Sequence, residues 1–595
     1  MSKKKARWRK LDNAAKLYSA ASNKKDTRVF RFYCELKEEV NPDVLQEALN
    51  QTIEIFPTFL MVLRKGLFWH YLEPCNLHPV VKEEYKEPCS RLYVKDKKTL
   101  LFEVTYYKKR INFEVFHVLT DGTGATEFLK ELVSNYLYLA HQKEGLEPVS
   151  MLPEDMTVQD QESDSFLKYY SKDQKRPKEK KTRAFQIRRK KKDGNHLHVH
   201  ESVVSVKEVL KRSRELGVSM TVFLTAVFLK AIHEEMSKMQ EKKPIVLMVP
   251  VNLRKFFPST SMLNFFNWIE PGYDFSKWDR SFEEVLGYTK DFFEEQLTKE
   301  KMSAHINDLL ALELHPILRL APLELKNLCI HAGEKFSEKN TTAIFSNMSA
   351  VRMPDSYVSY IERFGVFTNT PKLELCLCSF EDKLSFAFTS RYDTVNIERN
   401  FYRLLKEQGI TAEKVEPEFP MPQMPSEQEM KVYKVYSFLC LVLAAAMVVT
   451  DLNFHPRIRW TWFTAGGVAT MWIASSIGFF KRYNLLKNVM WQLLIGSIIC
   501  FIWDGFTGWH GWSVDLVLPI LSVATLAGMF VIAKVQKSPV REYLIYEIMA
   551  AVYGLILPVI LLVCGVVRKP TVSMFGALIC FLFLVGVILF KGREF

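Results

Sequence analysis

The sequence lacks the features that mark several protein classes. It has no Cys-x-x-Cys pair, and its ten cysteines are scattered along 595 residues, which excludes a small disulfide-stapled fold and indicates reduced thiols in a cytosolic domain. No glycine-rich phosphate loop occurs. The N-terminal stretch MSKKKARWRKLDNAAKLYSAASNKKD is basic but has no apolar core, so we expect no signal peptide.

Long apolar runs are scarce before residue 430 and abundant after it. The overall composition, 48% hydrophobic and 25% charged, is that of an ordinary globular protein. Its uneven distribution excludes both a disordered chain and a purely soluble one. The length alone favours about four domain-sized units.

Most of the net charge of +13 comes from one polar segment. Between Lys168 and Asp193 there are thirteen basic and three acidic residues, whereas Glu154–Asp164 holds five acids and no base. We interpret the basic run as a solvated linker. Contact with anionic lipid headgroups, worth about 1 kcal/mol per basic residue, is the alternative. No DNA- or RNA-binding motif accompanies the run, so nucleic acid is not an expected partner.

The C-terminal part predicts an all-α membrane domain. Most of its apolar segments approach the ~20 residues that cross a bilayer, and Trp and Tyr residues lie near their ends, as in an interfacial belt. Six spans are expected near residues 434–450, 460–480, 488–503, 514–533, 544–567 and 572–590.

The positions of Lys and Arg predict the orientation of these spans. The N-terminal flank, the loops after the second and fourth spans and the tail hold ten Lys and Arg residues, and the alternate loops hold four. The positive-inside rule then places both termini and the large N-terminal part in the cytosol of a multi-pass cell-membrane protein. Asp504 and Asp515 are interpreted as water-facing residues at span ends, and Glu547 as an interfacial residue.

The first 430 residues predict an α+β domain in two halves. Alternating apolar residues predict strands within 92–107, 110–117, 196–206, 245–254, 341–350, 372–380 and 384–392. Amphipathic or apolar periodicity predicts helices over 42–55, from about 123 to 142, and over 206–217, 221–236 and 398–409. The four prolines between Glu416 and Ser426 indicate a stiff tether.

The segment FEVFHVLTDGTG holds the strongest catalytic candidates. His117 leaves a predicted strand, and Asp121 and Gly122 lie in the turn before a helix. A rigidly held imidazole with a pKa near 6.5 suits a general base at neutral pH. Without other evidence, a strand-end His and a helix N-cap Asp remain the plainer interpretation.

The order of motifs resembles the CoA-dependent acyltransferase superfamily, which includes chloramphenicol acetyltransferase, condensation domains and alcohol acetyltransferases. HVLTDG resembles its HxxxDG motif, WRKLDNAAKLY its opening, and GVSMTVFLTAVFLKAI a helix pair of its second half. Val249–Asn267 resembles its PVNxR stretch and the Asn-containing segment after it, and Phe345–Pro354 resembles a late strand. The resemblance covers roughly residues 6–410. The six-span part resembles a membrane extension of some bacterial alcohol-acetyltransferase-like proteins.

The resemblance implies a chloramphenicol-acetyltransferase-like fold of two lobes with a channel between them. Acyl-CoA, acetyl-CoA in the first place, is the implied donor substrate, with no bound cofactor. His117 is then the general base, and Gly122 completes the motif. Asp121 is structural and pairs with an Arg, for which Arg254 is the candidate; a surface or phosphate-contacting role for Arg254 is the alternative. The channel or oxyanion candidates are Asn252, Asn264, Ser346 and Asn347.

The expected domains are 1–153 and 195–412 for the two lobes, 154–194 for the charged linker, 413–430 for the tether and 431–595 for the membrane. The expected function is transfer of an acyl group to a hydroxyl or amine. A membrane tether favours an amphiphilic or lipid-linked acceptor, so membrane lipids are expected partners. The alternatives are a non-catalytic binding module anchored in the membrane, or conduction by the spans.

No metal site is expected. His196, His198 and His200 alternate along one predicted strand, but no Cys or carboxylate cluster accompanies them. Cys376 and Cys378 likewise share one strand face and are interpreted as core residues.

Overall fold

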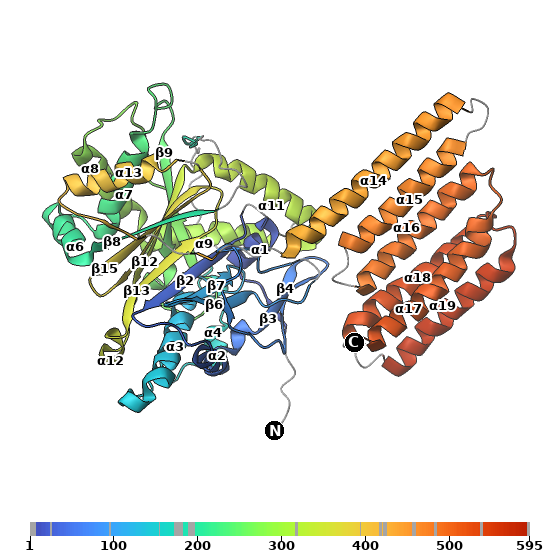
Figure 1. Cartoon of the computed structure of the whole chain (residues 1–595), viewed down its shortest axis with the longest axis horizontal. Helices are drawn as coiled ribbons and strands as arrows, with labels where there is room; N and C mark the ends of the chain where they lie inside the picture. The colour runs from blue at the N-terminus through green and yellow to red at the C-terminus, as the bar shows by residue number, and fades with distance from the viewer. Residues whose placement is uncertain are drawn as a thin grey trace. The chain divides into compact units, whose positions relative to one another are not determined.

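The computed structural model describes residues 8–23, 26–94, 97–153, 155–171, 183–187, 197–315, 319–392, 394–415, 419–420, 425–454, 460–480, 485–535 and 540–591. It divides the chain into two compact units, one of residues 1–94 and 98–423 and one mainly of residues 424–595. The larger unit is a mixed α+β structure of two lobes, as the sequence predicts (Figure 1).

The first lobe is built on a sheet of order β13-β2-β7-β6-β5. Its strands are β2 (Val29–Leu36), β5 (Lys82–Glu83), β6 (Phe102–Tyr107), β7 (Arg110–Phe116) and β13 (Ile361–Thr368). Helices α2 (Pro42–Ile55) and α3 (Gly122–His141) belong to the same core. Phe113 of β7 stacks on Phe128 of α3 with ring centroids 4.4 Å apart, and this packing fixes the start of α3 beside the end of β7.

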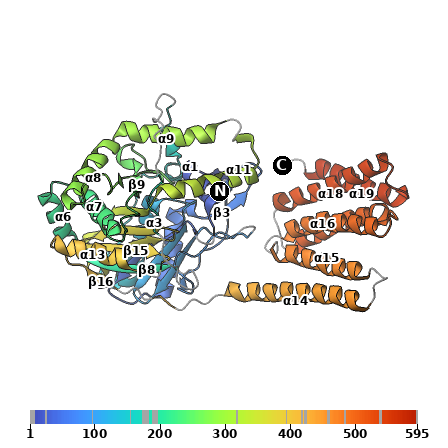
Figure 2. The same cartoon turned by 90° about the horizontal axis from the view of Figure 1, so that it is seen from above.

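A smaller sheet and a short helix complete this lobe. The sheet has the order β1-β4-β3, formed by Arg9–Lys10, His70–Pro74 and Met61–Lys65. Helix α1 (Asn13–Ala21) follows β1, and it is one of the elements beside α11 in both views (Figures 1 and 2).

The second lobe has a larger sheet of order β10-β9-β12-β14-β15-β8-β16, with β11 paired to β9. Its strands are β8 (His198–Ser205), β9 (Ile245–Asn252), β10 (Phe266–Ile269), β11 (Gly272–Tyr273), β12 (Ala343–Ala350), β14 (Leu373–Phe380), β15 (Lys383–Ser390) and β16 (Glu413–Val415). Its helices are α6 (Val206–Glu215), α7 (Met220–His233), α8 (Phe282–Gln296), α9 (Lys299–Leu314), α11 (Leu323–Ser337) and α13 (Asn396–Glu407). Helix α7 is apolar on nearly every side because it lies inside this core.

Strand β13 crosses from the second half of the sequence into the first lobe. It pairs antiparallel with β2, so that Phe364 lies opposite Cys34 and Val366 opposite Phe32. Gly365 is required at this crossing, because a Cβ there would lie 2.3 Å from the buried Tyr33 ring. Neither this strand nor helices α8, α9 and α11 were predicted from the sequence.

The segments expected to be linker and tether are partly docked on the larger unit. In the linker, the short helices α4 (Val158–Gln161) and α5 (Ser165–Lys168) precede the basic run. Outside both segments, the short helix α12 (Asp355–Val358) precedes β13. The backbone of Phe185 donates to Pro244, and β16 extends the second sheet. Phe419 lies over the buried guanidinium groups of Arg31 and Arg110, at 5.9 and 5.0 Å. Residues 172–182, 188–196, 416–418 and 421–424 lie outside the described residues.

The smaller unit consists of the helices α14 (Pro425–Phe454), α15 (Trp460–Phe480), α16 (Leu485–Phe506), α17 (Leu518–Val535), α18 (Val540–Val563) and α19 (Pro570–Lys591). Successive helices are neighbours, and α19 also contacts α17. A π-helical turn (Ser513–Val517) leads into α17. These helices occur where the spans were expected. Within the described residues, four of them, from α16 onward, are long and apolar enough to cross a membrane.

The interpretation of Asp504 and Asp515 as water-facing residues is wrong. Asp504 is fully buried and accepts hydrogen bonds from the backbone of His510, Gly511 and Ser513 and from the Ser513 hydroxyl. Asp515 accepts from the backbone N–H groups of Arg568 and Lys569, at 2.9 and 3.1 Å. Both carboxylates therefore hold loops together at one end of the helices, because buried backbone N–H groups need acceptors. Glu547 is also buried.

Candidate functional site

His117 lies in the turn that follows β7. Its backbone N–H donates to the carbonyl oxygen of Arg28 at 2.9 Å. The residue is half-buried, and its ring centroid lies 4.6 Å from Tyr18, 4.7 Å from Phe30 and 5.5 Å from Phe266. Aromatic rings therefore enclose most of the imidazole but leave it partly accessible.

This enclosure changes the protonation of His117. Burial lowers the pKa of His117 to about 4, against smaller opposing effects of the Asp121 charge and the Asn264 hydrogen bond. The sequence predicted a pKa near 6.5. The imidazole is therefore neutral at neutral pH and has an electron pair available to accept a proton.

Asn264, together with a hydrogen bond of the imidazole to the His117 backbone, bears on which ring nitrogen of His117 has that electron pair. The Asn264 amide nitrogen faces two oxygens, Oδ2 of Asp12 at 3.0 Å and the His117 carbonyl oxygen at 3.1 Å. Because both oxygens are acceptors, the amide oxygen is the atom that faces Nδ1 of His117, 3.0 Å away. Nδ1 thus donates, and Nε2 has the free electron pair. Asn264, an expected channel or oxyanion residue, is buried and contacts the imidazole.

Asp12 joins this network from the start of α1. Its Oδ1 accepts a 2.7 Å hydrogen bond from the N–H of Ala15, as an N-cap does. Its Oδ2 accepts from the backbone and the side-chain amide of Asn264. Burial raises the pKa of Asp12 to about 7, although these hydrogen bonds oppose the shift. Asp12 was not singled out from the sequence: an Asp before NAAKLY is an N-cap signal, but nothing in the sequence connects Asp12 with residue 264.

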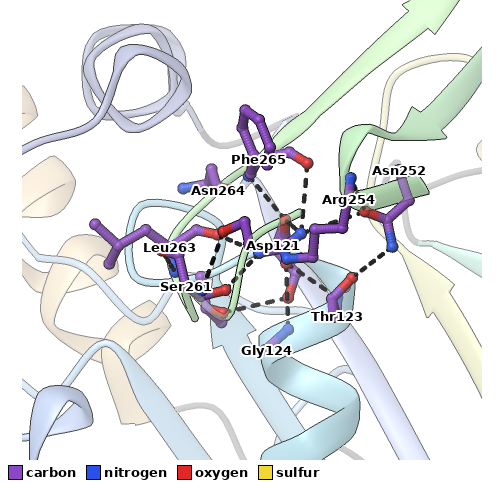
Figure 3. Close-up of polar contacts among 12 residues, drawn as sticks. Asp121, Thr123, Gly124, Asn252, Arg254, Ser261, Leu263, Asn264 and Phe265 are labelled. Atoms are coloured by element: carbon purple, nitrogen blue, oxygen red, sulfur yellow. Dashed lines mark hydrogen bonds and ion pairs between the residues drawn. The ribbon is translucent and has the colours of Figure 1, made fainter. Parts of the chain in front are cut away.

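Asp121 joins the two lobes through both of its oxygens (Figure 3). Its Oδ1 caps α3 by accepting from the N–H groups of Thr123 and Gly124, at 3.0 and 3.2 Å. Its Oδ2 accepts from Nη1 of Arg254 at 2.7 Å and from the N–H of Phe265 at 2.9 Å. The expected contact between Asp121 and Arg254 is therefore present, and the N-cap interpretation of Asp121 holds as well.

Arg254 also shapes the loop that holds Asn264. Its Nη2 donates to the carbonyl oxygens of Ser261 and Leu263, at 2.7 and 2.8 Å. Asn252, expected in the channel, accepts from the Arg254 N–H at 3.0 Å and donates to the Thr123 hydroxyl at 3.1 Å. The PVNLR residues thus hold the Asn264 loop against α3.

Two glycines allow the lobes to approach at this point. A Cβ on Gly122 would lie 1.7 Å from Cε of Met348 on β12. A Cβ on Gly124 would lie 2.1 Å from the Thr120 hydroxyl and 2.7 Å from the Met262 carbonyl oxygen. That hydroxyl donates to the same carbonyl oxygen at 2.6 Å. The glycine of the HVLTDG motif therefore gives room to a flexible side chain, whereas Gly124 gives room to backbone.

Ser346 and Asn347 face different sides of β12. The Ser346 hydroxyl contacts Sδ of Met348 at 3.6 Å, on the side where Met348 meets Gly122. The Asn347 amide donates to the Thr221 hydroxyl at 3.0 Å and accepts from the N–H of Ser349. Ser346 thus faces the start of α3, while Asn347 is engaged with α7.

No group of three or more His, Cys, Asp or Glu side chains that could hold a metal ion occurs among the described residues. His198 and His200 lie on β8, between β15 and β16, and His196 lies outside the described part of the chain. Cys376 and Cys378 are buried, and all ten cysteines of the sequence are free thiols.

We expect Gly124→Ala to lower the free energy of unfolding by about 1–3 kcal/mol, because the new methyl group displaces backbone. Gly122→Ala should lower it far less, since the Met348 side chain can rotate away. Urea unfolding of the two purified variants, followed by tryptophan fluorescence, measures the difference. If both variants lost the same free energy of unfolding, the backbone around Met262 would move aside as easily as the Met348 side chain.

Two sequence families match parts of the chain. Residues 146–307 match a family described as alcohol acetyltransferase, and residues 419–595 match a family of unknown function, DUF6320. No curated protein sequence matches the chain.

Among solved structures, TRI3 trichothecene 15-O-acetyltransferase from Fusarium sporotrichioides is 10% identical, and the match covers 69% of this chain and 96% of that one at a TM-score of 0.46. F. graminearum TRI101, complexed with coenzyme A and T-2 mycotoxin, is 12% identical, covering 68% and 100% at a TM-score of 0.48. The first condensation domain of the CDA synthetase is 13% identical, covering 68% and 96% at a TM-score of 0.44.

The alcohol acetyltransferase match includes Asn252, Arg254 and Asn264. His117 and Asp12 precede the matched residues. The resemblance drawn from the sequence motifs is confirmed by this match: over residues 146–307 the chain is similar to the alcohol acetyltransferases.

Proposed function

We propose that this chain is an acyltransferase that moves an acyl group from a CoA thioester to a hydroxyl or amine, with His117 as the general base. The observation that carries the proposal is the state of the imidazole. Nδ1 is engaged by Asn264, Nε2 has the free electron pair, and the residue is only half-buried. The family match over residues 146–307 supports the reaction class.

In the proposed reaction, Nε2 of His117 accepts the proton of the acceptor hydroxyl or amine. The acceptor oxygen or nitrogen attacks the thioester carbonyl carbon, and a tetrahedral intermediate forms. Its collapse breaks the carbon–sulfur bond, and the departing CoA thiolate takes the proton from the imidazolium. The products are an acyl ester or amide and free CoA, and no acyl-enzyme is needed.

The surroundings of His117 suit this proton transfer. With a pKa near 4, the ring is neutral at pH 7, so Nε2 is unprotonated before the acceptor binds, although the low pKa also makes it a weaker base than a free imidazole. The same burial makes the imidazolium unfavourable, which favours prompt release of the proton to the thiolate. The Asn264 oxygen and the Asp121 charge partly stabilise the cation while it exists.

The proposed oxyanion donor is the hydroxyl of Ser346. It lies on the side of β12 where Met348 meets Gly122. A preorganised donor of this kind typically contributes ~3 kcal/mol to the transition state. Asn347 is the weaker candidate, because its amide is bonded to Thr221.

We further propose that the α14–α19 unit spans the cell membrane, with the acyltransferase unit and both termini in the cytosol. The apolar helices from α16 onward and the ten-to-four distribution of Lys and Arg support this orientation. An acceptor dissolved in the same membrane is concentrated near the enzyme. An amphiphilic or lipid-linked alcohol or amine is therefore the proposed acceptor, and acetyl the proposed acyl group.

His117→Ala should reduce thioester turnover by about 10²–10⁴-fold, the usual contribution of a general base. Free thiol is measured with detergent-purified protein, a series of acyl-CoAs and crude lipid or alcohol acceptors. His141→Ala, a buried histidine at the end of α3 that contacts Glu144, is the matched control and should keep its turnover. Unchanged turnover in His117→Ala would overturn the assignment of the base. No turnover with any donor would favour a non-catalytic binding module.

Labelled acetyl-CoA incubated with the wild-type protein and a membrane lipid extract should give a labelled product in the organic phase. Tethering favours acceptors that share the membrane, and the label should be absent with His117→Ala. Label found only in small water-soluble alcohols would contradict the proposed acceptor class while leaving the chemistry intact.

A further inference from the structure

Asp12 is a buried carboxylate whose side chain accepts three hydrogen bonds from the protein. It accepts from the N–H of Ala15 and from two N–H groups of Asn264, at 2.7, 3.3 and 3.0 Å. All three partners are donors, and Asp12 is 3% exposed. A helix cap needs only the first of these contacts.

We infer that Asp12 is a positioning residue: its Oδ2 orients the Asn264 amide, and the amide oxygen in turn keeps the His117 proton on Nδ1 and the electron pair on Nε2. The catalytic consequence rests on the proposed function, but the tautomer itself does not. Asp12 belongs to the first lobe, and it reaches the imidazole only through a loop of the second.

The argument depends on hydrogen-bond polarity. An amide has one accepting and one donating end, so the group facing one end decides what the other end presents. While Oδ2 of Asp12 accepts, Asn264 presents its oxygen to His117. A donor at the Oδ2 position would oppose both N–H groups of Asn264. Rotation of the amide would relieve one conflict, but it would present an N–H group to Nδ1 and move the ring proton to Nε2.

Two substitutions separate this role from that of a helix cap. Asp12→Asn keeps the size and the cap of α1 but places an N–H group toward Asn264. Asp12→Ser also caps α1 but is too short to reach Asn264, so it introduces no opposing donor. As caps Asn and Ser are about equal, and Asn also keeps the size of Asp, so a capping and packing role predicts that Asn is no worse than Ser. Orientation of Asn264 predicts instead that Ser is the milder substitution.

The test combines thioester turnover with a measurement that needs no substrate. Diethyl pyrocarbonate acylates an accessible, unprotonated imidazole nitrogen, and peptide mass spectrometry reports its rate at His117 in the full chain. We expect Asp12→Asn to slow both labelling and turnover about tenfold or more, the effect of an unsatisfied buried donor. Asp12→Ser should be several-fold faster than Asp12→Asn in both measurements.

The double variant Asp12→Asn/Asn264→Asp relieves only the conflict between the two side chains, because the backbone N–H of residue 264 still opposes the new amide and the new carboxylate faces the His117 carbonyl oxygen. Any recovery should therefore be small. The carboxylate introduced at position 264 accepts from the amide introduced at position 12 through one oxygen and from Nδ1 of His117 through the other. Equal rates for Asp12→Asn and wild type, or slower rates for Asp12→Ser than for Asp12→Asn, would overturn the inference. If the labelling pattern holds but no variant turns over a thioester, the proposed function fails and the orientation of Asn264 stands.

The pH dependence gives an independent check. The groups whose charges act on Asp12 are Arg9 on β1, which favours the carboxylate, and Asp164 before α5, which opposes it, while burial raises the pKa of Asp12 to about 7. Below that pH the protonated carboxyl has an O–H donor, which creates the same conflict as Asp12→Asn. His117 labelling should therefore rise through about pH 7 in the wild type. In Asp12→Ser that step should vanish, leaving the His117 transition near pH 4. The same midpoint in both proteins would contradict the inference.

Discussion

The carboxylate of Asp121 is the contact on which the arrangement of the site depends. It satisfies two N–H groups at the start of α3 and, at the same time, the guanidinium of Arg254 and the N–H of Phe265. One buried anion thus joins both lobes, and removing one partner of such a pair typically costs about 3–5 kcal/mol. Arg254 in turn holds the loop of Asn264 through the carbonyl oxygens of Ser261 and Leu263, and Asn264 contacts the imidazole of His117.

The sequence predicts the local parts of this site well. Asp121 follows a strand and precedes a helix, so its role as an N-cap is visible in four or five residues, and Arg254 stands out in PVNLR. The sequence does not show that Asn264 contacts the imidazole from 147 positions away. It also gave His117 an ordinary pKa, because the three rings that lower the pKa come from α1, β2 and β10 and meet only in the folded chain.

The same distinction applies to the rest of the fold. Alternating apolar residues and hydropathy predict strands such as β7 and β14 and the helices α14–α19, because each pattern is local. Strand β13 pairs with β2, which lies more than three hundred residues earlier in the chain. No periodicity in the sequence predicts a pairing over that separation. Likewise, Asp504 and Asp515 looked like loop residues beside water, since their backbone donors come from turns whose geometry the sequence does not reveal.

The crossing of β13 affects how the protein is made. Strand β2 is an inner strand of the finished sheet, but until residue 361 has been synthesised one of its edges has no partner. At 5–20 residues per second, the ribosome needs about 10–50 s to proceed from the end of β7 to β13. Throughout that interval the nascent first lobe exposes the edge of an apolar strand, VFRFYCEL, a ready template for pairing with other chains. The order of synthesis thus leaves this edge unpaired until the segment that forms β13 has been added.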